Sequence, residues 1–584
     1  MSGIYKSHWH CILAVTSKPL SSTSTMMTIL PECLRLIMIA FALLFALLLL
    51  RSLRRQRHST SSAFIDNIPA PKSSSWLRGN YQQIFNSAAW PFHEFLRREY
   101  GSIVRLHGPF GASTLYTFDP KAMHHVLFTE HNVFDMSDGF IEGNRLNFGG
   151  GFFGTPGHEH RKQRKILNPV FSGAHLRDMI PTFFEITHKL EDALKRSLQS
   201  GSQTQEIDIL SWMGRTSLEI IGQAGLGYSL DPLTDEKIVH PYSRTIKKLV
   251  PTLMRVQFWR MNVLPRVVWI GSPGFRRLIV NMLPWKDVHQ IRDIVDYMWE
   301  VATEIYENKK RAFKMGDEAV AQQIGRGKDI ISVLMRANMK ASNEEKIQDK
   351  DVISQMSSLI FAATDTTSTA MARVLNLLAQ HPDVQERLRQ EIIEAKRQLD
   401  ERNLSFEELN ALPYLDAVCR ETLRMFPPVS TVFRVARQDT ALPLHKSITG
   451  LNGTEIHQVM VPKGTIVFLS IFNANRNPEL WGKDSEEWKP ERWLSPLSPE
   501  VVNARIPGVY SHLMTFIGGG RSCIGFKFAE LEMKVVISTL VERFKFSPST
   551  KQLEICWQMN NITTPIIGGK DDHPQLPINI SLVD

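Results

Sequence analysis

Cysteine is scarce in this sequence. The 584 residues contain five cysteines that lie far apart, and no two of them are separated by only two residues. A zinc ribbon or a thioredoxin-like dithiol needs such a close pair, and a disulfide framework needs many cysteines in a short chain. Both classes are therefore excluded, and the main part of the chain is expected to face a reducing compartment.

Blocks of positive charge are lacking as well. The formal net charge is +9 at pH 7, yet no run of lysine and arginine dominates any region. This distribution argues against nucleic acid as a partner. The densest basic cluster, in residues 51–57, directly follows an apolar run and indicates a membrane surface instead.

Long apolar runs are rare, and the most extended one covers residues 29–50. Within it, Leu36–Leu50 has no polar side chain. A run of about 20 apolar residues is enough to cross a bilayer as a helix, and the arginines that follow place the rest of the chain in the cytosol. We predict a single-pass helix in the endoplasmic reticulum membrane. A cleaved signal peptide is the alternative, but no small-residue cleavage site follows the run.

Composition divides the chain into four predicted segments. Residues 1–28 are rich in serine and threonine and are expected to be a disordered extension, which the membrane helix at 29–50 follows. Residues 51–75 combine basic residues with prolines and a serine run, so they are expected to form an extended linker. Residues 76–584 show no repeat and no internal boundary, and we predict that they form one catalytic domain.

Hydrophobic periodicity in the catalytic part predicts a mainly α domain with a smaller β part, an α+β fold. Residues 316–345 are polar and are expected to be a surface connection. The predicted helices are Pro181–Gln199, Val288–Arg311, Lys350–Ala379 and Asp383–Leu399, and the predicted strands are Leu115–Phe118 and Thr465–Ser470.

The sharpest motif is Phe516-Ile-Gly-Gly-Gly-Arg-Ser-Cys-Ile-Gly525, which matches F-x-x-G-x-R-x-C-x-G at every specified position. Successive glycines permit a tight turn that points backbone amides at the sulfur of Cys523. Such a turn, before a helix, stabilises a thiolate that can ligate iron. The alternative is a glycine-rich turn around a buried structural cysteine.

With this signature the sequence resembles the cytochrome P-450 family, and the segments Trp76–Asn80 and Pro413–Pro428 resemble its fungal microsomal members. The resemblance implies the cytochrome P-450 fold and haem b, with Cys523 as the axial ligand of the iron. It further implies that the surrounding motif residues shape the haem site. Phe516 shields the sulfur, Gly519 belongs to the tight turn, Gly525 leaves room for the porphyrin, and Arg521 is a partner of a propionate.

A second motif lies inside the long predicted helix, where residues 362–367 read Ala-Ala-Thr-Asp-Thr-Thr. Buried polar groups are costly unless they serve a purpose, and threonine hydroxyls can bond to the carbonyl four residues earlier. The segment resembles the family's A/G-G-x-D/E-T-T pattern, which implies that Asp365 and Thr366 deliver protons during oxygen activation. Ala363 stands where glycine is commonest in that pattern. The alternative is a polar seam against another helix.

A third pattern concerns charge pairs. Glu421 and Arg424 lie three residues apart on one predicted helix face, and Arg492 follows in Trp488-Lys-Pro-Glu-Arg-Trp493. By the resemblance, these three form a buried network that supports the haem pocket and takes no part in catalysis. The alternative is an ordinary surface ion pair.

The segment Gly157-His-Glu-His-Arg-Lys-Gln-Arg-Lys165 is similar to the family's W-x-x-x-R helix. The match implies that Arg164 contacts a propionate, with His160 standing in the place of tryptophan. Arg434 is another propionate candidate in the family layout. A metal site from His158 and His160 is the competing interpretation, which is disfavoured because residues two apart on a helix point in different directions.

The implied reaction is the hydroxylation or epoxidation of a hydrophobic small molecule with dioxygen, in fungal secondary metabolism and on a terpenoid-like substrate. Expected partners are an NADPH-dependent flavoprotein reductase, cytochrome b5 as a second candidate electron donor, and membrane lipid. The reductase is expected to dock near Arg521, Lys527 and Lys534. Residues 134–148, 249–263 and 428–433 are apolar enough to line the substrate pocket. The alternatives are a haem-thiolate isomerase or dehydratase that needs no reductase, and a non-catalytic membrane haem-binding protein.

Overall fold

The computed structural model describes residues 65–199, 204–234, 240–399, 402–551, 553–568 and 573–583, together with four isolated positions between 40 and 47. The chain divides into two compact units, Met1–Thr60 and Ser61–Asp584, of which the second is described below. The predicted extension at 1–28 and most of the predicted membrane helix at 29–50 lie outside the described residues. Within the described part, no helix combines the length and the apolar character needed to span a bilayer.

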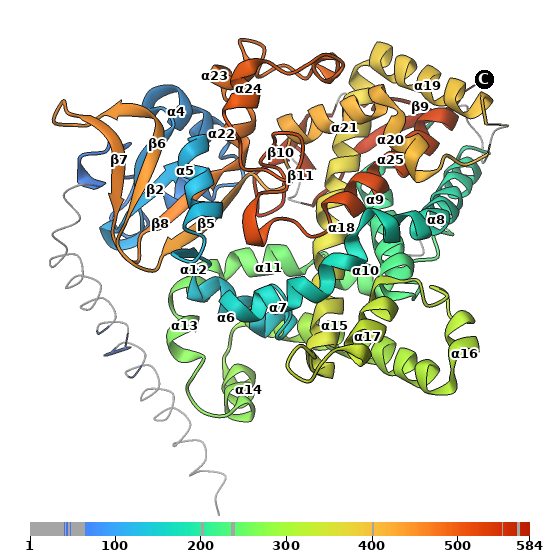
Figure 1. The fold of residues 1–584 in the computed structure, drawn as a ribbon, viewed down its shortest axis with the longest axis horizontal. Helices are drawn as coiled ribbons and strands as arrows, with labels where there is room; N and C mark the ends of the chain where they lie inside the picture. Colours follow the sequence, from blue (N-terminus) through green and yellow to red (C-terminus); the bar gives the residue numbers. More distant parts are fainter. Residues whose placement is uncertain are drawn as a thin grey trace, which may run out of the picture. The chain divides into compact units, whose positions relative to one another are not determined.

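The second unit is mainly helical, as the sequence predicts (Figure 1). Its longer helices are α4 Trp90–Tyr100, α6 Asp138–Phe148, α7 Gly157–Leu167, α8 Gly173–Gln199, α9 Ile209–Ile220, α14 Pro273–Met282, α15 Lys286–Met315, α17 Ile330–Lys340, α18 Asp349–Gln380, α19 Pro382–Arg397, α21 Pro413–Met425 and α25 Phe526–Arg543. Its shorter helices are α3 Tyr81–Ile84, α5 Pro120–His124, α10 Pro241–Ile246, α11 Leu249–Arg255, α12 Gln257–Asn262, α13 Leu264–Val267, α16 Asp317–Ala321, α20 Phe406–Ala411, α22 Ile471–Asn475, α23 Pro478–Trp481 and α24 Pro499–Asn503.

Helix α18 forms the centre of the helical part. It packs against α9, α15, α21 and α25, so most of its residues are buried (Figure 1). A helix that is covered on several sides needs apolar side chains around most of its circumference, which is why the polar residues 364–369 in its middle stand out.

The β part consists of small sheets. The five-stranded sheet has the order β1 Ile103–His107, β2 Ser113–Thr117, β8 Ile466–Ser470, β5 Thr431–Ala436 and β3 Phe134–Asp135. The other sheets are β4 Thr204–Asp208 with β12 Pro577–Leu582 and β9 Phe544–Pro548, β6 Thr440–Thr449 with β7 Glu455–Val461, and β10 Ile555–Gln558 with β11 Thr564–Ile567. Strand β2 pairs with β8 in parallel, with Leu115 opposite Val467, which joins the first and the last thirds of the domain.

Two expectations from the sequence need correction. Residues 316–345 are not only a surface connection, because they contain α16 and α17, and Ile330, Ile331 and Leu334 of α17 are fully buried. The packed unit also begins before residue 76. Ile65 and Ile68, which lie within the predicted linker at 51–75, are buried in the core. In both places a few apolar residues inside a polar stretch are enough to anchor the segment.

Candidate functional site

The loop before α25 makes close backbone approaches that require glycine. A Cβ on Gly518 would collide with the Pro507 carbonyl, and a Cβ on Gly519 would collide with the Leu127 carbonyl. Gly519 also has φ of +75°, a conformation that other residues adopt only with strain. Gly520 differs from both, because a Cβ there would meet nothing within 4 Å. Two of the three glycines therefore fix the path of the loop.

The loop presents Cys523 at the start of α25. Its backbone N–H donates to the Phe516 carbonyl at 2.9 Å, and the Phe516 ring packs edge-on against Tyr510, with 5.5 Å between the ring centres. Burial raises the pKa of the Cys523 thiol, while the Gly525 N–H and the Arg164 guanidinium lower it. The residue nevertheless presents accessible surface, so the thiol faces a space inside the protein.

Four predicted haem-site residues belong to one cluster, which Arg164 links to the thiol. Arg164, from α7, donates to the Ser522 carbonyl at 2.8 Å. Arg434, from β5, is 4 % exposed, and burial lowers its pKa to about 10. Arg521 donates to the Thr155 carbonyl at 3.1 Å. Burial and the charges of these arginines together lower the pKa of His160 to about 3, so this histidine is neutral at physiological pH.

One carboxylate belongs to this cluster, and no sequence motif pointed to it. Asp135, from β3, pairs with Arg521 at 3.3 Å, and its charge also acts on Arg434 and His160. One carboxylate does not balance three arginines, so the described part of the cluster carries surplus positive charge. The histidines of α7 do not form a metal site, because His160 is buried while the side chain of His158 is 80 % exposed.

The polar middle of α18 has the predicted local geometry. The Thr366 hydroxyl donates to the Ala362 carbonyl at 2.7 Å, and Thr364 does the same to Ile360 at 2.7 Å. The Asp365 carboxyl makes no hydrogen bond to a described side chain or backbone group, and burial raises its pKa to about 6. The Lys247 ammonium, which follows α10, opposes this rise. The sequence did not indicate Lys247.

The predicted charge network is fully assembled and buried. Both oxygens of Glu421 accept from Arg424 at 2.8 Å, and Arg492 adds a contact at 3.3 Å. Arg424 also donates to the carbonyls of residues 475, 485 and 487. Trp493 donates to Glu421 at 2.9 Å, a contact that the sequence did not predict. A buried ion pair stabilises only when its remaining polar groups are satisfied, and here they are.

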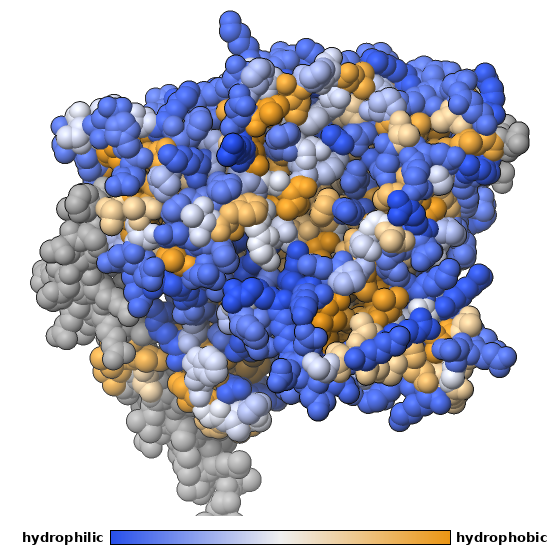
Figure 2. Space-filling view, in the orientation of Figure 1, coloured by the Kyte–Doolittle hydropathy of each residue, from blue (hydrophilic) through white to orange (hydrophobic). Residues whose placement is uncertain are grey.

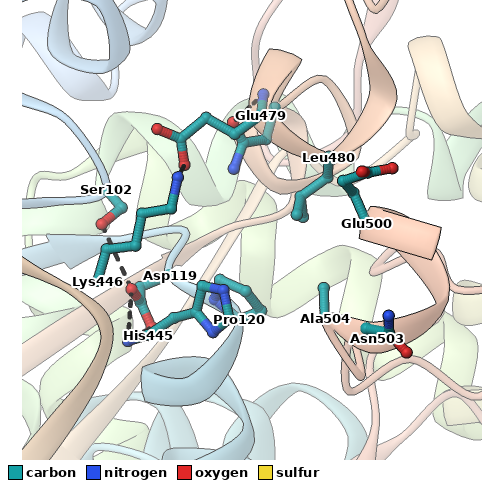
Figure 3. Close-up of a pocket in the computed structure, with 11 residues that line it drawn as sticks. Ser102, Asp119, Pro120, His445, Lys446, Glu479, Leu480, Glu500, Asn503 and Ala504 are labelled. Carbon is teal, nitrogen blue, oxygen red and sulfur yellow. Dashed lines mark hydrogen bonds and ion pairs between the residues drawn. The ribbon is translucent and has the colours of Figure 1, made fainter. Parts of the chain in front are cut away.

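A surface pocket of about 200 Å³ lies apart from this cluster, between the five-stranded sheet and α23–α24 (Figure 3). Asp119 lines it, but this carboxylate already accepts from the N–H groups of Ala122 and His445 at 2.9 and 3.0 Å. Lys446 and Glu479 at its rim pair with each other at 3.0 Å. The charges of Asp119, Lys446 and Glu479 are therefore already engaged, and none of them points to a ligand.

The cluster around Cys523 fits a haem group by its donor chemistry. It combines a thiol that faces internal space, three arginines with one carboxylate, and a neutral imidazole that can donate one N–H. A thiolate is a ligand of haem iron, and surplus guanidinium groups suit the two propionates of haem b.

Comparison with known proteins agrees with this chemistry. The family model "Cytochrome P-450" matches residues 69–569. Cytochrome P-450 monooxygenase 91 of Postia placenta is 47 % identical over 519 residues, which cover 89 % of this chain and 94 % of that protein. The ganoderic acid synthetase of Ganoderma lucidum is 40 % identical over 518 residues, covering 88 % and 94 %. A cytochrome P-450 monooxygenase of Hericium erinaceus is 37 % identical over 550 residues, covering 92 % and 97 %.

These matches span most of the chain and include every element that builds the site. The family binds haem b, and the relatives are named as monooxygenases. The chain is a member of the cytochrome P-450 family and a haem-dependent monooxygenase of fungal type.

Proposed function

We propose that the sulfur of Cys523 ligates the haem iron and that Arg164, Arg434, Arg521 and His160 hold the propionates. The observation that supports this assignment best is the concentration of three arginines around His160, one of which, Arg164, also acts on the Cys523 thiol. We assign the Phe516 ring, which packs against Tyr510, the role of shielding the sulfur from water. We assign a structural role to the network of Glu421, Arg424 and Arg492. It holds the segment of residues 475–487 in place and does not touch the reacting atoms.

We also propose that Asp365 and Thr366 carry protons during the reaction. A thiolate-ligated haem supplies the reductive activation of dioxygen, and this activation consumes protons. Asp365, with a pKa of about 6, can both hold and release a proton near neutral pH. The Thr366 hydroxyl stands next to it on the same helix and keeps its lone pairs free, because its proton is donated to Ala362.

The proposed substrate is a hydrophobic, terpenoid-like molecule of fungal secondary metabolism, which is hydroxylated or epoxidised. The name of the relative ganoderic acid synthetase supports this class. Aromatic rings from separate elements also pair with each other. The ring centres of Phe148 of α6 and Phe361 of α18 lie 4.8 Å apart, and those of Phe140 of α6 and Phe433 of β5 lie 6.2 Å apart. Such rings contact the apolar body of a ligand without fixing its identity.

We propose that electrons arrive from NADPH through a flavoprotein reductase, with cytochrome b5 as a second donor. Two of the three docking residues expected from the sequence are unsuited to docking. Lys534 is buried and pairs with Asp416 and Glu530 at 2.9 and 3.0 Å, and Arg521 turns towards Asp135. Lys527 remains exposed. Arg161 is exposed on α7, the helix that bonds to the loop through Arg164, and it completes the proposed docking surface.

We propose an endoplasmic reticulum location, with residues 29–50 as a single-pass anchor and the catalytic domain in the cytosol. An exposed apolar surface, which we call the apolar ridge, supports contact with lipid. Figure 2 shows hydrophobic side chains gathered over α13. The ridge consists of Trp259, Trp269, Ile270, Phe275, Leu278 and Met282, all of which are exposed. Soluble proteins rarely expose so many large apolar groups in one stretch.

The experiment that tests the proposed function is expression with a fungal reductase, followed by measurement of NADPH consumption and untargeted product analysis. The expected result is NADPH-dependent and oxygen-dependent formation of a product that carries an added oxygen atom. Product formation without NADPH would favour a haem-thiolate isomerase or dehydratase. Haem binding without turnover on any terpenoid would favour a non-catalytic haem protein. The presence of Asp365 and Thr366 favours the monooxygenase, because neither alternative needs a proton relay.

A further inference from the structure

Helices α6 and α12 approach each other unusually closely. A Cβ on Gly139 of α6 would lie 2.7 Å from the Met261 carbonyl oxygen, and a Cβ on Gly143 would collide with the Arg260 side chain. Both glycines belong to one face of α6, since they are four residues apart. The two glycines therefore let α12 lie directly on α6.

Four polar residues belong to the stretches of these helices that lie near their contact. Gln257 and Arg260 lie three apart on α12, and Asn144 and Asn147 lie three apart on α6. Met261 meets Gly139, and Arg260 meets Gly143 and Asn144. Residues further along α6 thus contact residues that come earlier in α12, so the two helices run antiparallel where they touch. By this order, Gln257 of α12 is expected opposite Asn147 of α6. We call these four residues the α6–α12 seam.

The seam leaves much of its hydrogen-bonding capacity unused within the described residues. Arg260 donates to Asn144 Oδ1 at 2.6 Å, which is one of the five hydrogen bonds that a guanidinium can make. Asn147 is 7 % exposed, and its Nδ2 has no hydrogen-bond partner. Gln257 Oε1 is buried and also has none. Buried polar groups are normally satisfied, so the seam has room in its hydrogen bonding for water or for a bound polar group.

The charge of the seam is positive and uncompensated among the described residues. Burial alone lowers the pKa of Arg260 to about 10, and no carboxylate lies close enough to oppose it. The carboxylates of α6 are engaged elsewhere: Glu142 pairs with Arg145 at 2.9 Å, and Asp138 pairs with Arg437 at 2.9 Å. A guanidinium with two amide neighbours and no counter-charge suits an anion far better than an amine.

The seam also borders the aromatic rings that face α18. Helix α6 carries Phe140 and Phe148, whose rings contact Phe433 and Phe361, and Phe361 lies on the same helix as Asp365 and Thr366. By helical geometry, Asn144 lies between Phe140 and Phe148 on that side of α6. A long apolar molecule against these rings can therefore place one end at the seam.

We propose that the α6–α12 seam binds the carboxylate of an amphipathic substrate, with Arg260 and Asn147 as the donors. This inference rests on the proposed monooxygenase function and narrows its substrate class to apolar carboxylic acids. Gln257 accepts a hydrogen bond from a hydroxyl near the acid group when the substrate carries one. Asn144 holds the guanidinium in position and does not itself bind the acid.

The test compares a tetracyclic triterpene carboxylic acid with its methyl ester on the full-length holoprotein, by calorimetry and by the haem spin-state shift. The wild type is expected to bind the acid more tightly than the ester. Arg260→Gln should weaken acid binding about 10- to 100-fold, as the loss of a charge-assisted hydrogen bond does, and should leave ester binding unchanged. Asn147→Asp should weaken acid binding as well, because it brings a like charge to the carboxylate.

The matched control is Arg276→Gln on α14, where the guanidinium bonds to the Gly271 carbonyl and lies outside the seam. It should bind acid and ester as the wild type does. The carbon monoxide spectrum and the thermal midpoint of every variant establish that it is folded. Equal binding of acid and ester by the wild type, binding of neither, or an unchanged acid preference in folded Arg260→Gln would overturn the proposal. An intact thiolate-haem spectrum in the same samples would show that the proposed function survives this failure.

Discussion

Two neighbouring side chains on α18, Thr366 and Asp365, differ sharply in their hydrogen bonding. Thr366 Oγ1 donates to the Ala362 carbonyl at 2.7 Å, so its proton has a fixed position. The Asp365 carboxyl has no hydrogen bond within the described residues and has a pKa of about 6. An acid that titrates near neutral pH, beside a hydroxyl whose lone pairs can accept a hydrogen bond, is compatible with the proposed proton relay.

Replacement of Thr366 by alanine should uncouple the enzyme. We expect NADPH consumption to continue while product yield falls at least about tenfold, because the hydroxyl that passes the proton is gone. Thr366→Ser keeps the hydroxyl and should keep most of the coupling. The ratio of product formed to NADPH consumed measures the effect, and an unchanged ratio in the alanine variant would refute the relay.

The pH dependence of turnover should reflect Asp365. The proton-holding fraction of this carboxyl falls as pH rises through about 6, so the rate of product formation should fall over the same interval. Asp365→Asn should be slower by about 100-fold or more and should lack this titration. Lys247→Met removes the cation that lowers the pKa of Asp365, and should shift the midpoint of the rate profile to higher pH. A midpoint that stays in place would exclude the influence of Lys247.

At the scale of elements, the thiolate loop offers a matched pair of substitutions. Gly519→Ala places a Cβ against the Leu127 carbonyl at a φ of +75° and should displace the loop. Gly520→Ala meets nothing within 4 Å and should be tolerated. We expect Gly519→Ala to lower haem content and the thermal midpoint, and Gly520→Ala to change neither. Similar haem content in both variants would contradict the described path of the loop.

Helix α25 buries an acid that the reaction does not use. Glu532 is fully buried, and burial raises its pKa to about 8 against the opposing effect of the Ser217 hydroxyl on α9. The unfolded chain loses this proton near pH 4.5. Between pH 4.5 and 8 the unfolded state therefore binds fewer protons, and stability falls as pH rises, by about 1.4 kcal/mol per pH unit.

Substitution of Glu532 by glutamine should remove this part of the pH dependence. We expect the thermal midpoint of the wild type to decline between pH 5 and 8 more steeply than that of Glu532→Gln. The variant should be the more stable protein at pH 8, because it has no carboxylate to bury. Parallel midpoint curves would show that Glu532 does not hold a proton in the folded state.

Elements with local signals could be predicted from the sequence, and contacts between distant segments could not. Helix α18 spans Asp349–Gln380, close to the predicted Lys350–Ala379, because its apolar pattern is continuous. The sequence did not indicate Asp135 beside Arg521, since nothing local in β3 marks a contact with a loop almost 400 residues away. Helix α17 was missed because its mainly apolar first half, Ile330–Met335, is short and has polar residues on both sides.

At the scale of the whole molecule, the fold brings three distant segments to one thiol. Helix α7 contributes Arg164, strand β5 contributes Arg434, and the loop before α25 contributes Arg521 and Cys523. Helix α18, which packs on α25, carries Asp365 and Thr366, the proposed proton carriers. This convergence depends on the parallel pairing of β2 with β8 and on the buried Glu421–Arg424 network, which position the sheet and the loop.

The proposed chemistry depends most on ligation of haem iron by the Cys523 thiolate, and one spectrum tests this ligation directly. The haem-loaded protein is reduced and exposed to carbon monoxide, and its Soret band is recorded together with that of Cys523→Ser. We predict the long-wavelength Soret band of thiolate-ligated haem for the wild type and its absence from the serine variant. A wild-type band at the shorter wavelength of histidine-ligated haem, in folded protein, would contradict the assignment.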